Sequence, residues 1–312
     1  MEGITMPYVR EDVQNMLSML ASIGGPQMHE VTPEEARAMY RQMGAIAERP
    51  LPAGVVTADL EIPGPAHPIP LRTYMPEGAC LDGTVIMFFH GGGWVIGDLE
   101  SHHSLCGEIA KLTGYPVVAV DYRLAPEHRY PAAVDDSLAA ARWVAGHPKE
   151  LGLHAERLIF CGDSAGGNLS AIAARELRRE LNVAAQWLIY PGVDMLSTEG
   201  SMQEFAQGYL LTAAGMAWFG EQYAAEVTSP RASPLLSDDW DDLPPALVFT
   251  CGLDPLRDQG RAYAGKLIAT GNRVIFREAA GQVHGSAQLR GALPSAQADL
   301  EGQVSDLKAL LA

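Results

Sequence analysis

The sequence predicts an α/β protein whose mostly parallel sheet is covered by helices on both faces. Two observations carry this prediction: near-continuous apolar runs recur after Pro52, and from the third run onward helical stretches separate them. The 312 residues are enough for one large domain, or at most two. Hydrophobic residues make up 47% and charged residues 19% of the chain, which is typical of a globular protein.

Two helices are predicted within the first fifty residues. The first has an apolar stripe formed by Val9, Val13, Met16, Leu17 and Leu20. The Gly-Gly-Pro break at 24–26 separates it from a second helix that starts after Thr32. Thr32 can cap this second helix, Pro33 suits its first turn, and Glu35 completes a capping box.

Eight later runs are predicted as the strands of one sheet. They are Val55–Ile62, Ile69–Met75, Thr84–Phe89, Val117–Asp121, Arg157–Cys161, Ala185–Tyr190, Ala246–Cys251 and Arg273–Glu278. The first two are close enough for a hairpin, so we expect the sheet to begin antiparallel. Helices are predicted at Pro131–Gly146, Ala165–Leu181 and Arg257–Thr270. The segment from Asp194 to Ala225 fits this alternation poorly and is predicted to be a largely helical insertion.

Charge and cysteine usage restrict the partners and the location. The formal net charge is -16 and no Lys/Arg-rich run occurs, so nucleic acids and anionic membranes are not expected as partners. The N-terminus lacks the basic and apolar regions of a secretory signal, and the apolar runs are too short to span a membrane. The four cysteines form no CxxC or CxxH pattern, so we expect a reducing, cytoplasmic location.

The segment Gly162-Asp163-Ser164-Ala165-Gly166-Gly167 lies between an apolar run and a helical stretch. A G-x-S-x-G pattern in this setting predicts a nucleophile elbow, in which small neighbours allow a sharp turn that exposes the serine Oγ. The N-terminus of the following helix helps to stabilise negative charge at that place. The pentapeptide alone fits an ordinary glycine-rich turn equally well, but the flanking strand and helix favour Ser164 as a nucleophile.

The segment His90-Gly91-Gly92-Gly93-Trp94 directly follows the run that ends at Phe89. A glycine triplet lets backbone N–H groups point into a cavity, where they can hold an oxyanion. We predict that the N–H groups of Gly91, Gly92 and Ala165 form this oxyanion hole. A flexible glycine turn is the alternative. We interpret His90 as a loop-shaping residue and Trp94 as either a pocket wall or part of the core.

The expected chain order of such a triad is serine, acid, histidine. Only one histidine, His284, follows Ser164, and it comes just after the last predicted strand. His284 is therefore the predicted general base.

Several carboxylates compete for the role of the residue that orients His284. Asp254 follows the run that ends at Cys251. Asp258 begins a predicted helix, where a carboxylate is favourable without any catalytic role. A further acidic cluster at 238–242 is interpreted as a solvated loop. We predict Asp254, because all three triad members then lie just past strand ends, where open α/β sheets build their sites.

Other site patterns are weak. His102-His103, with Asp98 nearby, suggests a metal site, but neither an HExxH motif nor a second set of spaced ligands accompanies it. No G-x-x-x-x-G-K-[ST] loop and no G-x-G-x-x-G fingerprint occur. We therefore expect no metal and no organic cofactor.

Five motifs, taken in this order, resemble those of the hormone-sensitive lipase family of esterases, in its bacterial family IV branch. They are His90-Gly91-Gly92-Gly93-Trp94, Asp121-Tyr122-Arg123-Leu124-Ala125-Pro126-Glu127, Gly162-Asp163-Ser164-Ala165-Gly166-Gly167, Asp254-Pro255-Leu256 and His284-Gly285. The resemblance runs roughly from Val55 to the end. It implies an α/β-hydrolase fold with eight core strands and a helical cap. Residues 1–50 and an insertion at about 194–225 would form the cap, and residues 51–312 the catalytic domain.

Further expectations concern residues around the triad. The Tyr122–Glu127 segment is interpreted as scaffold behind the oxyanion loop, in which Arg123 and Glu127 can pair. Members of the resembled family often carry a bulky aromatic after the His-Gly pair, where this chain has Ser286. This difference affects the expected packing of the histidine loop and not the choice of base. Trp94, Tyr209 and Asp163 are assigned to the substrate-binding surface.

The expected reaction is ester hydrolysis through an acyl-enzyme on Ser164. Amidase, peptidase or acyltransferase chemistry stays open, because leaving-group choice depends on pocket shape. A non-catalytic small-molecule receptor on the same fold is a further alternative, although such a protein typically loses a triad residue. Because a cap rich in apolar residues limits chain length, we expect short- to medium-chain acyl esters as substrates of a monomer or homodimer.

Overall fold

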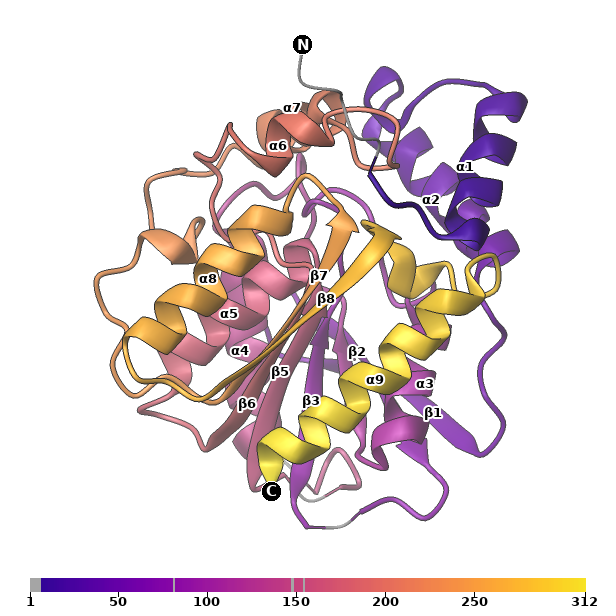
Figure 1. The fold of residues 1–312 in the computed structure, drawn as a ribbon. Helices are drawn as coiled ribbons and strands as arrows, with labels where there is room; N and C mark the ends of the chain where they lie inside the picture. The colour runs from indigo at the N-terminus through magenta and orange to yellow at the C-terminus, as the bar shows by residue number, and fades with distance from the viewer. Residues whose placement is uncertain (1–6, 81, 147–148, 154) are drawn as a thin grey trace.

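The computed structural model describes residues 7–80, 82–146, 149–153 and 155–312. An eight-stranded sheet forms its centre, in the order β1-β2-β4-β3-β5-β6-β7-β8 (Figure 1). The strands are β1 (Val55–Ile62), β2 (Ile69–Pro76), β3 (Thr84–Phe89), β4 (Val117–Val120), β5 (Arg157–Asp163), β6 (Val183–Ile189), β7 (Ala246–Leu253) and β8 (Val274–Val283). The pairs β1–β2 and β2–β4 are antiparallel and the other pairs are parallel. The predicted sheet, with its antiparallel beginning, is confirmed.

Helices cover both faces of the sheet. One face carries α3 (His103–Thr113) and α9 (Pro294–Leu311), and the other carries α4 (Ala132–Gly146), α5 (Ala165–Leu177) and α8 (Arg257–Ala269). Strand β3 has an apolar side chain at every position after Thr84, and its burial explains why. Phe89 belongs to the core beneath α4 and α5, whereas its neighbour Phe88 belongs to the core beneath α3 and α9. A central strand that is buried on both faces favours apolar side chains on both, which gives a near-continuous apolar run.

Four further helices lie beyond the carboxyl ends of the parallel strands (Figure 1). They are α1 (Glu11–Ile23), α2 (Pro33–Ala47), α6 (Ser201–Glu204) and α7 (Ala213–Tyr223). In α2 the Thr32 side chain accepts a hydrogen bond from the Glu35 N–H, and the Glu35 carboxylate accepts one from the Thr32 N–H. The predicted capping box is therefore confirmed. The division into a cap and a catalytic domain stays a prediction.

Several predicted boundaries were wrong. The insertion is less helical than expected, because irregular chain joins the four-residue α6 to α7. Helix α5 ends at Leu177 instead of Leu181, and the chain continues as a turn. Strand β8 runs to Val283 instead of Glu278. Its pairing with β7 shifts register between Cys251 and Leu253, so extra residues of β8 are accommodated before His284.

Candidate active site

The three predicted triad residues each directly follow a strand. Ser164 follows β5, Asp254 follows β7 and His284 follows β8. Strands β5 and β7 flank β6, and β8 lies beside β7, all parallel. The carboxyl ends of parallel strands meet at one edge of the sheet, so the fold brings the three side chains together.

Ser164 occupies a sharp turn between β5 and α5. Its φ of 54° is positive, a conformation that side-chain-bearing residues adopt at an energetic cost. Close backbone approach explains the glycines around it. A Cβ on Gly162 would lie 2.4 Å from the Phe89 carbonyl oxygen, and one on Gly166 would lie 1.8 Å from the same oxygen. Neither position accepts a side chain, and the turn holds Ser164 above the strand end.

A continuous hydrogen-bonded chain joins the three side chains. His284 Nε2 lies 2.9 Å from Ser164 Oγ, and His284 Nδ1 lies 2.8 Å from Asp254 Oδ2. The other carboxylate oxygen of Asp254 accepts the Leu256 N–H at 2.8 Å, which fixes the carboxylate. Asp254 is fully buried and His284 is nearly so. The arrangement can accept a proton from Ser164 and stabilise the resulting imidazolium.

Asp258, the competing carboxylate, serves a different part of the structure. It accepts the Ser201 N–H at 2.9 Å and forms ion pairs with Arg257 and Arg261. These contacts hold α6 against α8 and leave Asp258 unconnected to His284.

The oxyanion loop, residues 90–98, requires one correction. The Gly91 N–H donates to Asp163 Oδ1 at 2.8 Å, so this N–H is already used inside the protein. The prediction of Gly91 as an oxyanion donor was therefore wrong. A Cβ on Gly91 would also lie 2.4 Å from Asp163 Oδ2, which explains the glycine at this position by packing.

Three other backbone N–H groups near Ser164 have no acceptor among the described residues. They belong to Gly92, Gly93 and Ala165. Gly92 and Gly93 have φ angles of 112° and 59°, in the region that favours glycine. Ala165 opens α5, where the first N–H groups lack intrahelical partners and favour negative charge.

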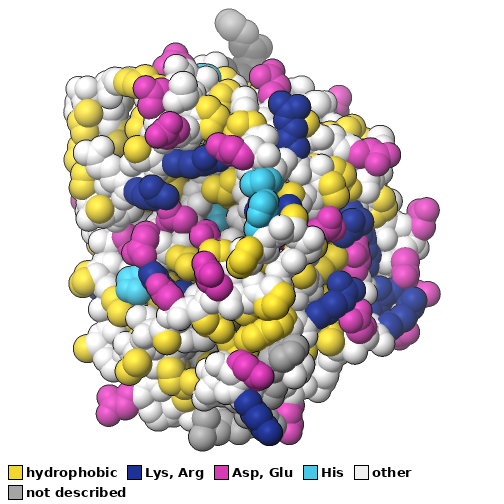
Figure 2. Space-filling model, turned by 180° about the vertical axis from the view of Figure 1, so that it is seen from behind, with side chains coloured by type: hydrophobic (Ala, Val, Ile, Leu, Met, Phe, Trp, Pro, Cys, Tyr) yellow, Lys and Arg dark blue, Asp and Glu magenta, His cyan; other side chains and the backbone are white. Residues whose placement is uncertain are grey.

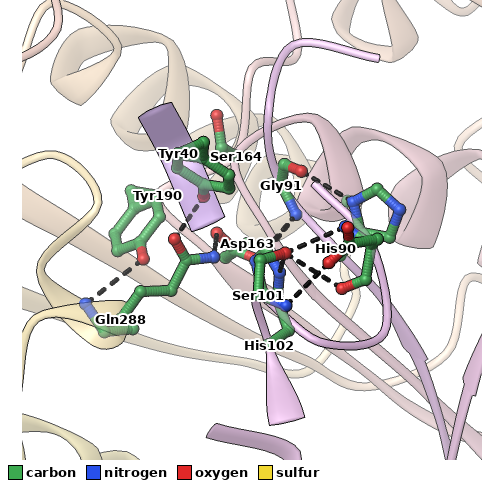
Figure 3. A network of polar contacts seen from close by, with 12 residues as sticks. Tyr40, His90, Gly91, Ser101, His102, Asp163, Ser164, Tyr190 and Gln288 are labelled. Carbon is green, nitrogen blue, oxygen red and sulfur yellow. Dashed lines mark hydrogen bonds and ion pairs between the residues drawn. The ribbon is translucent and has the colours of Figure 1, made fainter. Parts of the chain in front are cut away.

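Asp163 lies between the loop and the elbow instead of on a substrate surface. Its carboxylate is 2% exposed; it also accepts the Gln288 Nε2–H at 3.3 Å, and His102 Nε2 lies 3.2 Å away (Figure 3). Burial raises the pKa of the Asp163 carboxyl to about 6, against the opposing effect of the hydrogen bonds. The assignment of Asp163 to substrate binding was wrong, because every one of these partners belongs to the protein interior.

The other two residues assigned to substrate binding lie in different surroundings. Trp94 is 7% exposed, and its ring stacks on Tyr223 of α7 with centroids 4.4 Å apart. Trp94 thus belongs to a core cluster, and its contact with substrate stays a prediction. Tyr209 is half-buried beside Phe205 and packs against a cluster that includes Leu289 and Val283, the residue before His284. Its contact with substrate stays a prediction.

The segment behind the oxyanion loop supports it through a different pairing from the one predicted. Tyr122 donates its hydroxyl to the His90 carbonyl at 2.6 Å and stacks on the His90 ring. Burial lowers the pKa of His90 to about 4, so His90 is neutral near pH 7. The expected Arg123–Glu127 pair was wrong. Arg123 donates from Nε and Nη2 to the two carboxylate oxygens of the buried Asp136, at 2.8 and 2.7 Å.

Sequence reasoning missed three residues around the site. Tyr190 follows β6; its ring lies against His284, and its hydroxyl accepts the Ala287 N–H at 3.3 Å. Gln288 and Tyr40 extend the contacts of Asp163 toward α2 (Figure 3). Position past a strand end is the signal that points to Tyr190, whereas nothing in the sequence pattern indicates Tyr40 or Gln288.

Ser286 is buried, and its Oγ lies 3.6 Å from Cys251 Sγ.

The paired histidines do not form a metal centre. His102 faces Asp163, whereas His103 Nδ1 lies 3.2 Å from both Arg72 and Tyr74. Among the described residues, no group of three or more His, Cys, Asp or Glu side chains has an arrangement suited to a metal ion.

Comparison with known proteins gives consistent matches. A family model described as alpha/beta hydrolase fold matches residues 86–288. The chain is 37% identical to an ethyl acetate hydrolase of Pseudomonas putida over 91% of both chains. It is 42% identical to the carboxylic ester hydrolase LipN of Mycobacterium tuberculosis, over 74% of this chain and 64% of LipN, just under two thirds of that protein.

Solved structures agree with these sequence matches. A thermostable esterase from Pseudomonas putida superposes with a TM-score of 0.93 and 34% identity, covering 99% of both chains. An ester hydrolase from the metagenome of Lake Arreo, in complex with a bipyridine phosphonate derivative, gives a TM-score of 0.92 and 37% identity. That match covers 97% of this chain and 99% of the other.

Proposed function

The chain belongs to the α/β-hydrolase fold family and is a carboxylic ester hydrolase, and from this premise we propose that Ser164 carries the reaction on short- to medium-chain acyl esters. The observation that carries the proposal is the hydrogen-bonded chain Ser164–His284–Asp254 at the strand ends. Nucleophile, base and orienting acid in this geometry are the arrangement of a serine acyl-transfer enzyme.

In the proposed reaction His284 takes the Ser164 proton while Ser164 Oγ attacks the ester carbonyl. Asp254 holds the imidazole in the tautomer whose Nε2 accepts that proton, and it stabilises the imidazolium. His284 then donates the proton to the leaving alcohol. Water repeats the sequence on the acyl-enzyme, which releases the acid and restores Ser164.

The tetrahedral intermediate needs donors aimed at its oxyanion. We assign this role to the N–H groups of Gly92, Gly93 and Ala165, which the described residues leave without acceptors. Each such donor lowers the barrier by roughly 3 kcal/mol when it is fixed in place before the reaction.

The packing above the site supports a substrate of limited length. From α1 and the insertion, Met16 and Phe205 are buried in one cluster with Val283, which directly precedes His284, and with Leu289. Apolar side chains over the strand ends exclude water and restrict the space available to an acyl chain.

The surface supports a small-molecule substrate and no polyanionic partner. On the face seen in Figure 2, Lys and Arg side chains lie beside Asp and Glu instead of forming a separate basic patch. No helix in the described part of the chain is both long and apolar enough to cross a bilayer. The proposed cytoplasmic location is supported by the four cysteines, which are all free thiols.

The test is hydrolysis of p-nitrophenyl esters from acetate to palmitate, with matched p-nitroanilides as amide probes. We expect kcat/KM to be highest between acetate and hexanoate, and the anilides to react far more slowly. Higher efficiency on emulsified long-chain triglyceride, with activation at the interface, would show a true lipase. Faster cleavage of the anilides would show an amidase.

A further inference from the structure

Asp163 connects the nucleophile to the oxyanion loop. It directly precedes Ser164 in the chain, and its carboxylate accepts the Gly91 N–H at 2.8 Å. Gly91 in turn directly precedes the two glycines that we assign as oxyanion donors. The position of this carboxylate therefore determines where the donors stand relative to Ser164 Oγ.

Gln288 and Tyr40 hold that carboxylate from the opposite side. Gln288 is 4% exposed and donates its Nε2–H to Asp163 Oδ2 at 3.3 Å. The Tyr40 hydroxyl donates to Gln288 Oε1 (Figure 3). This second bond orients the amide, because a carbonyl oxygen bound to Tyr40 leaves the NH₂ group to face Asp163. Burial and the nearby carboxylates raise the pKa of Tyr40, which keeps its hydroxyl protonated as a donor.

The same helix also holds the far end of the oxyanion loop. From α2, Arg37 donates to the Val95 carbonyl at 2.8 Å and to the Ala125 carbonyl at 2.9 Å. Arg41 forms an ion pair with Asp98. Helix α2 thus contacts the loop directly at residues 95–98 and reaches its beginning through Gln288 and Asp163.

We propose that Tyr40 and Gln288 are positioning residues for ester hydrolysis: through Asp163 they fix the oxyanion loop against the nucleophile. Helix α2 then belongs to the catalytic apparatus as well as lying over the site. This inference rests on the proposed function, because the loop matters only if it binds an oxyanion. Loss of the Tyr40 hydroxyl should weaken stabilisation of the transition state, and so lower kcat, more than it changes KM. The reason is that no atom of Tyr40 needs to touch the substrate.

A matched control exists elsewhere in the core. The buried Tyr263 donates its hydroxyl to Gln186 Oε1 at 3.2 Å, which is also a tyrosine–glutamine bond. Tyr263→Phe therefore removes the same type of hydrogen bond between α8 and β6, in a core cluster separate from the Asp163 contacts.

The experiment compares Tyr40→Phe, Gln288→Met, the double variant and Tyr263→Phe with p-nitrophenyl butyrate. We expect Tyr40→Phe to lower kcat on the order of tenfold with KM within twofold. A trifluoromethyl ketone, whose hemiketal oxyanion occupies the same hole, should lose affinity by a similar factor. The double variant should be no worse than the more damaging single variant, because both changes break one chain of contacts. Tyr263→Phe should keep kcat within twofold.

Three results would overturn the proposal. The first is a kcat of Tyr40→Phe equal to that of Tyr263→Phe. The second is a Tyr40→Phe variant in which only KM rises. The third is a double variant whose loss of kcat is the product of the two single losses. Hydrogen exchange of residues 90–98 provides a readout independent of catalysis. It should accelerate in Tyr40→Phe and stay unchanged in Tyr263→Phe, and equal exchange in both would also contradict the proposal. Failure of the proposed function is distinct, since it would show as an inactive wild-type protein.

Discussion

The Asp163 carboxylate accepts the Gly91 backbone N–H at 2.8 Å, so the residue next to the nucleophile determines where the oxyanion loop begins. This single bond has two consequences. It removes the Gly91 N–H from the set of oxyanion donors. It also places an ionisable residue, Asp163, which is only 2% exposed, beside the nucleophile. The motif Gly-Asp-Ser-Ala-Gly therefore carries a structural aspartate beside its catalytic serine.

Asp163 should make stability depend on pH in a defined direction. Its folded pKa is about 6, above the ordinary value of 3.8, so between these values the folded protein holds a proton that the unfolded chain has released. Stability should therefore fall as pH rises from about 4 to about 6, by up to roughly 3 kcal/mol from this group.

Other carboxyls with raised pKa values, such as those of the partly buried Asp121 and Glu48, contribute in the same direction. The measurement is therefore the difference in unfolding free energy between wild type and Asp163→Asn, obtained by urea titration from pH 4 to 8. We expect the stability of Asp163→Asn relative to wild type to increase as pH rises. A difference independent of pH would show that Asp163 titrates near its ordinary value.

The orienting acid can be distinguished from its neighbour by two matched substitutions. Asp254→Asn should lower kcat by roughly 10²- to 10⁴-fold, because the amide no longer favours the tautomer of His284 that accepts the Ser164 proton. Asp258→Asn should cost less than about tenfold, since Asp258 binds Ser201, Arg257 and Arg261 instead. Steady-state kinetics on p-nitrophenyl butyrate measures both. Greater damage from Asp258→Asn would mean that the acid is misassigned.

The support behind the oxyanion loop predicts unequal effects for Arg123 and Glu127. Arg123→Met should destabilise the fold by roughly 3 kcal/mol, because it leaves the buried Asp136 without its charged partner. Glu127→Gln should cost under about 1 kcal/mol, because Glu127 lies at the surface, where it pairs with Arg37. Urea unfolding at pH 7 compares the two variants. Equal losses would favour an Arg123–Glu127 pair after all.

The sequence predicted those features that depend on local pattern. Apolar runs and turn glycines identified the eight strands. The chain order of serine, acid and histidine selected His284, and position after a strand end selected Asp254. Boundaries were less accurate wherever tertiary contact overrides pattern. Strand β8 continues through Ala-Ala-Gly because β7 pairs with it across a bulge. In the predicted stripe of α1, Val13 and Met16 are buried, whereas Leu20 is 37% exposed.

Contacts between segments far apart in the chain could not be predicted from the sequence. The glycine motif predicted Gly91 as an oxyanion donor, but its N–H donates to a carboxylate 72 positions away in the chain. Arg123 pairs with Asp136 on α4 and not with Glu127 in its own motif, because the folded α4 places a buried acid there. Tyr40 reaches Gln288 over 248 positions. Such pairs depend on how elements pack, which no local pattern contains.

The most direct test of the central claim is the site of covalent labelling by a fluorophosphonate, read by peptide mass spectrometry on wild type and Ser164→Ala. We predict a single adduct, on Ser164, together with loss of esterase activity. In Ser164→Ala the adduct should be absent and activity should fall by about 10⁴- to 10⁶-fold with an unchanged unfolding midpoint. An adduct on another serine, or hydrolysis by folded Ser164→Ala at the wild-type rate, would contradict the account.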